Sequence, residues 1–526
     1  MAISVVACDH KRTSGVGRAG VVSAIGALLL GHSGSVWSQT LTSATGPAIP
    51  FRVQSSLSGS ATYSDNINLA PPGQERSDLV MVVSPLLSVQ RNGPRLRLQV
   101  AYSPELLFYT NGTNGASLRN TLDGSGTAEI IQGRLYFDAL ARISQQNVSP
   151  FGTLAANSVN GSNNRAEART LSFGPYFRSN FGQDGSYQLG YRHSRTEFNN
   201  AALSRSETNE IYGSASGNTG LRDLNWGLNA NRQDANYAGL RTQRFEQASG
   251  TLTYRIESRI SVHATAGVDR NSYTTFSGET SKGSYYSAGF DWSPTPTTNL
   301  SGQYGHRYFG ATELLQFSHR SRDTIWRLGY TKDRTTSVEL LSAPADVNTA
   351  VLLNNFFLSR YPDPAARAQA ITTLLQQSIL PNGRLTQFNF LSNQVFLQQR
   401  LDASVSLIGK RSAFSFGINS SKQTALSDQN VPSDVFATNR SFRQSGVNAN
   451  WNYTLGQRTS ATFSAQRQKS EAIGGPGKTT QRILSASLQR QLQRNLTASL
   501  TVHNIRQDGT ANYKENAIAA AAHLQF

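Results

Sequence analysis

The chain has 526 residues, enough for several soluble domains, yet only 38% of them are hydrophobic and 44 are glycine. No apolar stretch approaches the ~18 residues of a membrane-crossing helix, and long amphipathic helical patterns are nearly absent. The 24 Phe, 19 Tyr and 5 Trp argue against a disordered chain. With a formal net charge of +17, the sequence describes a strongly basic, polar β-protein.

The N-terminus predicts an export signal. Basic residues precede a short apolar run over 21–30, and small residues follow up to Ser38 at the spacing that a signal peptidase recognises. We expect residues 1–38 to be a signal peptide and residues 39–526 to form an outer-membrane β-barrel. The only cysteine, Cys8, falls in the removed segment, so no disulfide or cysteine metal site is expected.

The first mature strands are predicted over 51–63, 79–89 and 96–109, and the tight turn Asn92-Gly93-Pro94 separates the last two. Around them lie Tyr63-Ser64-Asp65-Asn66-Ile67-Asn68-Leu69, Gly73, Ser77-Asp78, Pro85, Leu98 and Tyr102. With these residues the chain resembles the PEP-CTERM system-associated outer-membrane protein family, whose members lie near exosortase and exopolysaccharide genes. Asp65 and Asn66 are also ordinary loop formers, which explains their presence equally well.

Apolar and polar residues alternate with period two in many later segments. Examples are Leu135 to Ile143, Leu224 to Ala230, Ile260 to Val268, Tyr286 to Trp292, Val447 to Leu455 and Leu496 to Val502. Many segments end in Tyr, Phe or Trp, as the aromatic girdles of a membrane barrel require. A β-propeller would show a fixed repeat of ~40 to 50 residues, and no such repeat is found.

Short and long connections also alternate along the chain. Turns such as Gln132-Gly133 and Gly409-Lys410 are separated by longer polar links such as 149–165 and 424–440. Short periplasmic turns that alternate with long outer loops are typical of outer-membrane barrels. The fold predicted is therefore all-β: a large transmembrane antiparallel β-barrel of about 22 strands, within a range of about 18 to 24, with both termini periplasmic.

One segment, 338–390, breaks the alternation and is expected to be a helical extracellular insert. Asp363-Pro364 provides an N-cap and a proline at the first helical position, and a further helix is plausible over 347–358. The sequence from Tyr361 to Ala368 is again similar to the PEP-CTERM-associated family. The insert could be a lid or plug folded into the pore, or a helical hairpin on the rim.

The last residues, from Ala517 to Phe526, alternate strictly and end in an aromatic residue. Ile518, Leu524 and Phe526 fall on one face of an extended strand, whereas His523 falls on the other. This pattern is typical of the closing strand of a barrel. We expect Phe526 and Leu524 to form the signal that the barrel-assembly machinery recognises.

No residue pattern predicts catalysis, a cofactor or a metal. Gly474 to Thr479 resembles a phosphate-binding loop, but position 472 is alanine and no flanking strand and helix are predicted. The histidines form no recognisable triad with serine and a carboxylate. Nucleic-acid binding is disfavoured because the arginines are dispersed.

The basic charge suggests a selective lumen. Seven arginines are expected on the non-lipid face of their strands: Arg134, Arg142, Arg178, Arg192, Arg255, Arg327 and Arg400. Rings of this sign select anions in pores, unless carboxylates such as Asp138, Asp269, Asp291 and Asp402 neutralise them. The function predicted is a non-enzymatic pore for exopolysaccharide export, with outer-membrane lipid, the polymer and periplasmic export components as partners. The polymer follows from the family resemblance alone. A structural or anchoring barrel for sorted surface proteins and a general porin are the alternatives.

Overall fold

The computed structural model describes residues 51–526 except 183, 201–202, 274, 276–280, 343–389 and 429–433. The predicted signal peptide and the helices expected over 347–358 and after Asp363 lie outside these described residues. None of the described helices is long and apolar enough to cross a membrane.

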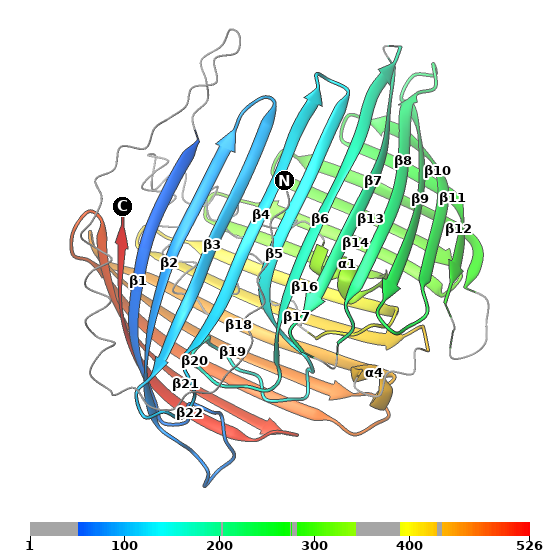
Figure 1. Ribbon diagram of the computed structural model, residues 1–526. Coiled ribbons are helices and arrows are strands. Elements are labelled where there is room, and N and C mark those ends of the chain that lie inside the picture. The colour runs from blue at the N-terminus through cyan, green and yellow to red at the C-terminus, as the bar shows by residue number, and fades with distance from the viewer. Residues whose placement is uncertain are drawn as a thin grey trace, which may run out of the picture. The chain divides into compact units, whose positions relative to one another are not determined.

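The described residues form 22 strands joined in one antiparallel sheet (Figure 1). The first eleven are β1 (Arg52–Ser64), β2 (Asp78–Asn92), β3 (Leu96–Tyr109), β4 (Ser117–Ile131), β5 (Leu135–Asn147), β6 (Arg165–Phe181), β7 (Gly185–Phe198), β8 (Ser206–Asn218), β9 (Leu224–Tyr237), β10 (Gln243–Glu257) and β11 (Ile260–Ser272). The others are β12 (Lys282–Thr295), β13 (Thr298–Arg307), β14 (Gly310–Arg320), β15 (Thr324–Thr335), β16 (Phe396–Ile408), β17 (Ser412–Ala425), β18 (Ser441–Gly456), β19 (Thr459–Ala472), β20 (Lys478–Gln491), β21 (Leu496–Gly509) and β22 (Tyr513–Gln525). Two short helices, α1 (Ser337–Ser342) and α4 (Val435–Thr438), are described between strands.

Each strand pairs with the next one in the chain, and β22 pairs with β1, so the sheet closes into a barrel. Ser56 lies opposite Gln525 and Ser64 lies opposite Ala517 in the closing pair. Closure leaves no unpaired sheet edge, which is the condition for a sheet to cross a bilayer. The predicted strand number and the predicted closing strand at the C-terminus are both confirmed.

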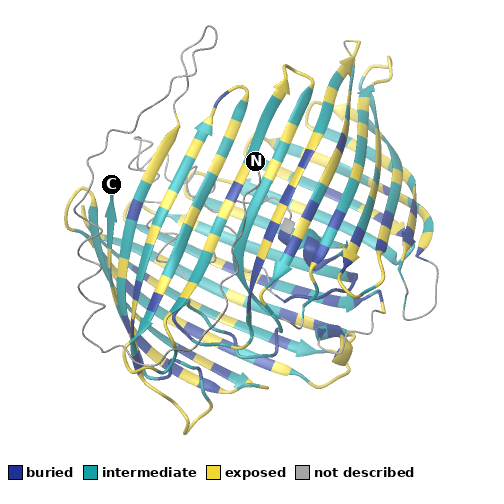
Figure 2. Ribbon diagram, viewed as in Figure 1, coloured by how far each residue is buried: buried dark blue, intermediate teal, exposed yellow. Residues whose placement is uncertain are grey.

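Alternation along the strands separates two faces, and exposed residues recur along each strand in Figure 2. On β22, Ile518 is 45% exposed on the outer face, whereas His523 on the inner face lies 2.8 Å from the Ser58 hydroxyl. The same outer face carries Leu484, Val502 and Trp451 on neighbouring strands. Apolar residues thus face outward and polar residues line the lumen, as a membrane barrel requires.

The two ends of the barrel differ. The connections that leave an odd-numbered strand include the long segments 65–77, 148–164, 336–395 and 426–440. The connections that leave an even-numbered strand span only a few residues. In the β4–β5 turn, Gly133 has a φ of 68°, a conformation that glycine adopts without strain. The start of β1 and the end of β22 both lie at this short-turn end. By the general rule for such barrels, the long-loop end faces the cell exterior.

Buried apolar residues gather at the long-loop end and not in the middle of the barrel. Five clusters of them combine strand ends with residues of the long loops. One cluster consists of Ile67, Val80, Val82, Leu107 and Val159. The long loops therefore fold inward and pack inside the wall, and this packing positions the candidate site.

Candidate functional site: a lumen capped at its long-loop end

Helix α1 follows β15 directly and turns into the lumen. Its start is fixed by a capping box, because the Thr336 hydroxyl accepts a hydrogen bond from the Glu339 backbone N–H at 3.2 Å and the Glu339 carboxylate accepts one from the Thr336 N–H at 3.0 Å. Arg334 adds an ion pair to Glu339 at 3.3 Å. The first residues of the predicted insert are thus tied to the end of β15.

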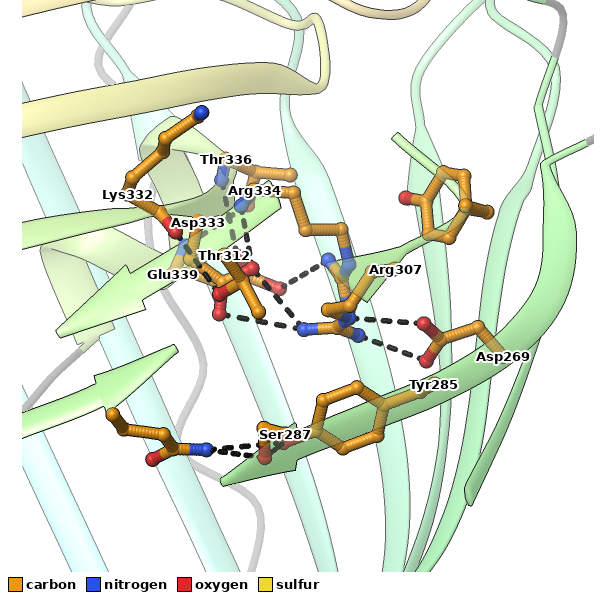
Figure 3. Close-up of polar contacts among 12 residues, drawn as sticks. Asp269, Tyr285, Ser287, Arg307, Thr312, Lys332, Asp333, Arg334, Thr336 and Glu339 are labelled. Atoms are coloured by element: carbon orange, nitrogen blue, oxygen red, sulfur yellow. Dashed lines mark hydrogen bonds and ion pairs between the residues drawn. The ribbon is translucent and has the colours of Figure 1, made fainter. Parts of the chain in front are cut away.

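The wall beside α1 holds a buried charge network (Figure 3). The Arg307 guanidinium donates to both carboxylate oxygens of Asp269, at 2.9 and 2.8 Å, and reaches Asp333 at 3.1 Å. The side chains of Arg307 and Asp269 are only 8% and 1% exposed. The network therefore links β11, β13 and β15 beside α1, and removing one partner would leave an uncompensated buried charge.

Helix α1 also contacts the opposite part of the wall. Arg142 of β5 donates a hydrogen bond from its guanidinium to the Leu341 carbonyl at 2.9 Å. The Leu341 side chain packs with Ala166 and Ala168 of β6 and with Leu391. Since β15 and β5 are far apart around the barrel, α1 spans part of the lumen between them.

A second bridge is formed by the β5–β6 loop, residues 148–164, which reaches the inner faces of β20–β22. The Leu154 carbonyl accepts hydrogen bonds from Gln481 at 2.6 Å and from the Tyr513 hydroxyl at 2.5 Å. Asn160 donates to the buried Glu515 carboxylate at 2.6 Å. Four strands, β1 to β4, lie between β5 and β22 by the shorter way round, so this loop spans part of the lumen.

These segments meet at an aromatic cluster. Phe436 of α4 is 1% exposed, and its ring lies 5.3 Å from that of Phe442, 5.6 Å from that of Phe396 and 5.9 Å from that of Phe390. Phe151 of the β5–β6 loop stacks edge-on against Phe442 at 5.8 Å. The cluster joins the β5–β6 loop to both segments that flank β16 and β17.

Asp434 organises the polar side of this cluster. Its carboxylate caps α4 by accepting from the Phe436 N–H at 2.9 Å, and it also accepts from the Asn393 N–H and the Ser392 hydroxyl. Burial raises the pKa of Asp434 above its ordinary value, while the three donors act in the opposite direction. Nearby, Thr275 forms an isolated antiparallel bridge with Ser427, a third connection between distant parts of the rim.

We call these inward segments the outer cap: residues 148–164, 336–342, 390–395, 426–428 and 434–440. Below the cap lies a vestibule, a cavity of about 830 Å³. Gln90, Asn92 and Arg97 line it near the short β2–β3 turn, and Val338 and Glu339 of α1 line it at the other end. The vestibule therefore extends from the short-turn end of the barrel up to the underside of α1.

The charges of the vestibule are largely matched. Arg192 and Glu210 form an ion pair at 3.0 Å, and Asp138 accepts a hydrogen bond from Thr127 at 2.7 Å. Polar side chains of β5–β9 fill the space between them. No group of three or more His, Cys, Asp or Glu in the described part of the chain could hold a metal ion.

The seven predicted lumenal arginines take four kinds of position. Arg142, Arg192 and Arg400 face the lumen and pair with Asp123 at 3.7 Å, Glu210 at 3.0 Å and Asp402 at 2.5 Å. Arg327 lies on the inner face of β15, where it has no ion pair among the described residues. Arg178 and Arg255 are exposed on strand ends near the short turns.

For one of the seven arginines, the predicted position on a strand is wrong. Arg134 lies in the β4–β5 turn and not in a strand, because the hairpin closes around Gly133 before the alternating pattern begins. The predicted neutralisation is found in part, since Asp402 pairs with Arg400 and Asp269 pairs with Arg307. Asp291 instead lies 3.6 Å from His263.

Sequence reasoning missed the residues that build the cap. Arg307, Glu339 and Glu515 were not singled out, although each is part of a bridge or of its support. The spacing of Thr336 and Glu339 is a capping-box signal that could have located α1. The contacts of Arg307 and Glu515 join residues far apart in the chain, and no local pattern marks them.

Taken together, a closed barrel with an apolar outer face, a polar lumen and inward long loops defines an outer-membrane β-barrel with a capped lumen. No protein-family model matches the sequence, and no curated protein matches it.

Among solved structures, the siderophore receptor PirA from Acinetobacter baumannii is similar over 90% of this chain and 80% of its own, with 9% identity and a TM-score of 0.49. The ferric-catecholate import receptor Fiu from E. coli K12, in its closed form, is similar over 90% and 82%, with 10% identity and a TM-score of 0.47. The iron transporter FrpB from Neisseria meningitidis shares 8% identity over 90% and 82%, with a TM-score of 0.45. We draw no substrate from similarities this distant.

Proposed function

We propose that this chain forms a gated pore in the outer membrane and that the outer cap is the gate. The observation that carries the proposal is the vestibule of about 830 Å³, which runs from the short-turn end and stops beneath α1. A solute that enters from the short-turn end meets the cap after passing a polar, charge-matched wall. Such a path serves export when the cap opens and prevents leakage when it is closed.

The construction of the cap supports a movable gate. Its segments are held to one another and to the wall by side-chain hydrogen bonds and by buried apolar clusters, one of them aromatic, whereas the wall itself is a continuous hydrogen-bonded sheet. Displacing α1 and the β5–β6 loop would break hydrogen bonds and apolar contacts inside the lumen but would leave every strand pair of the wall intact.

We propose an exopolysaccharide as the exported polymer. Support comes from the resemblance of residues 63–78 and 361–368 to the PEP-CTERM-associated family, together with the amide, hydroxyl and charged side chains in the vestibule lining. A polymer rich in hydroxyl groups would exchange its hydration for the amide, hydroxyl and guanidinium groups that line the wall. The partners proposed are periplasmic export components at the short-turn end.

Single-channel conductance in planar bilayers tests the gate. We expect rare openings for the wild type and frequent openings when contacts that hold the cap are removed. Arg142→Gln, which removes the hydrogen bond to Leu341, should act in the same direction, whereas Arg178→Gln on the exposed rim serves as the matched control. Constitutive conductance of the wild type would favour a general porin.

A closed cap also favours the second candidate, a structural or anchoring barrel for sorted surface proteins. Complete absence of conductance in all variants, with correctly folded barrels, would establish that alternative over the pore. The polymer is tested separately, by measuring surface exopolysaccharide in cells that lack the protein. An unchanged amount of polymer would refute the proposed substrate and leave the gate untouched.

The orientation has its own test. An epitope tag placed near Asn382, within the long β15–β16 connection, should be detected on intact cells, because the long-loop end is expected outside. Detection only after permeabilisation of the outer membrane would reverse the assignment and turn the proposed export gate toward the periplasm.

A further inference from the structure

A row of four basic residues crosses neighbouring strands on the outer face of the barrel. Arg467 on β19 lies directly opposite Arg482 on β20. Arg482 in turn lies opposite Arg506 on β21, and Arg506 lies opposite Lys514 on β22. We call these four residues the basic row. All four are exposed, and they share a face with Leu484, Val502 and Ile518, which are about half exposed.

Like charges in this arrangement repel one another. Directly opposed residues of an antiparallel pair bring their side chains to about 4.5–5.5 Å, and like charges there are destabilising. Arg506 has a partner in Asp508 at 3.0 Å, but Arg467, Arg482 and Lys514 form no ion pair within the part of the chain that the structure describes. The nearby carboxylate of Asp65 accepts hydrogen bonds from Asn516.

Around β7 to β10, the outward arginines are paired with carboxylates. Arg195 pairs with Glu197 and lies 3.8 Å from Glu207, and Arg244 pairs with Asp234 at 2.6 Å. Arg205 and Arg232 are likewise matched to carboxylates. In the basic row Arg506 alone has such a partner among the described residues, so the other three charges are left without a counterion there.

An apolar groove begins directly below the basic row. It has a volume of about 800 Å³ and is lined by outward residues of β17–β22 and β1. Its upper tier contains Ala465, Leu484, Asn504 and Asn516, each two residues along its strand from a member of the row. Two residues of a strand span about 6.7 Å, so the charges stand one tier above the start of the groove.

The lining of the groove is mainly apolar and would accommodate acyl chains. Small side chains at Ala449, Ala465 and Ala486 form its depth, and the rings of Trp451 and Phe463 stand beside it, 5.5 Å apart. The groove thus opens on the lipid-facing side of the wall, with cations on its outer-leaflet rim.

We propose that the basic row and the groove bind a lipid of the outer leaflet that carries phosphate groups. The phosphates lie against Arg467, Arg482, Arg506 and Lys514, and acyl chains lie in the groove below. Guanidinium groups recognise phosphate through paired hydrogen bonds, and a phosphate between opposed arginines removes their repulsion. Bound lipid would hold β19–β22 and β1 together at the seam where the barrel closes.

Lipid binding to the purified full-length barrel in detergent tests this proposal, with diphosphoryl lipid A as the probe and native mass spectrometry as the readout. Replacing the four residues of the basic row by glutamine should weaken binding on the order of 100-fold or more, because each basic residue near an anionic lipid contributes roughly fivefold. The matched control replaces Arg195, Arg205, Arg232 and Arg244 by glutamine and should retain binding. Heat-modifiable migration verifies that each variant is folded.

Two further measurements separate the parts of the site. Ala486→Trp, which fills the groove but leaves the row intact, should weaken binding of lipid A. Lipid A without phosphates should bind poorly to the wild type. The proposal would be overturned if the phosphorylated and dephosphorylated lipids bound equally well, or if both quadruple variants lost the same amount of lipid binding. Competition by inorganic phosphate at the same concentration as lipid A would also overturn it.

Discussion

Replacing Phe436 by alanine should open the gate. The ring is the centre of the aromatic cluster, 1% exposed and within 5.9 Å of three other rings, so its removal leaves a cavity among Phe390, Phe396 and Phe442. Loss of a buried phenylalanine side chain costs about 3–5 kcal/mol. If the closed cap bears about 3 kcal/mol of this loss and the open state none, the ratio of open to closed states rises roughly 150-fold.

The assay is the open probability of single channels in planar bilayers, recorded for the wild type and for Phe436→Ala. Phe416→Ala is the matched control, because Phe416 is 37% exposed on the outer face of β17 and contacts lipid. We expect a large rise for the first variant and none for the second. An unchanged open probability for a folded Phe436→Ala barrel would refute the view that the aromatic cluster holds the gate closed.

Three other predictions address the wall, the lumen and assembly. Arg307→Gln should destabilise the barrel by about 3–5 kcal/mol because it leaves the buried Asp269 unpaired, and the double replacement with Asp269→Met should recover part of the loss in urea unfolding. Arg192→Gln should shift the reversal potential toward cations and Glu210→Gln toward anions, since each leaves its partner uncompensated; identical shifts would show that the pair lies off the conduction path. Deleting Phe526 should lower the yield of folded, heat-modifiable barrel, and an unchanged yield would remove its role as an assembly signal.

The strands of the wall were predictable because the alternation of apolar and polar residues within each strand is a local sequence pattern. A strand between lipid and a polar lumen must alternate apolar and polar residues, so the pattern from Leu135 to Ile143 or from Ile518 to Phe526 is visible in the sequence itself. The alternation of short turns with long loops gave the strand number in the same way. Arg134 was misplaced because alternation alone does not locate the residue at which a hairpin turns.

The cap was not predictable because its contacts are long-range. Leu154 bonds to Gln481 and Tyr513, and Asn160 to Glu515, across more than three hundred positions of sequence. Such contacts depend on how far each loop folds inward, which no periodicity records. The sequence also placed the excess basic charge in the lumen, whereas four of those charges form the row on the outer face of β19–β22.

Anion selectivity of the pore stays a prediction, but fewer unpaired lumenal arginines now support it. Pairing of Arg142, Arg192 and Arg400 with carboxylates removes much of the fixed charge on which it rested. Arg327 is the lumenal arginine of the predicted set without such a pair among the described residues. A weak anion preference that disappears in Arg327→Gln is therefore the outcome that the geometry favours.

The central claim, that the outer cap gates the lumen, is tested most directly by locking the cap. Thr275 and Ser427 are antiparallel bridge partners, and such pairs have Cα atoms about 4.5–5.5 Å apart, within the range of a disulfide. The double variant Thr275→Cys/Ser427→Cys, with Cys8→Ser, should form a disulfide that ties the rim together. A control disulfide on the wall joins the β20–β21 partners Ser487→Cys and Thr501→Cys.

Single-channel recordings of both variants before and after reduction give the answer. The account predicts that the oxidised Thr275→Cys/Ser427→Cys barrel is silent, that a reducing agent restores the wild-type openings, and that the wall disulfide changes nothing. Equal conductance of the oxidised and reduced forms of the cap variant, with the disulfide verified by mass spectrometry, would contradict it.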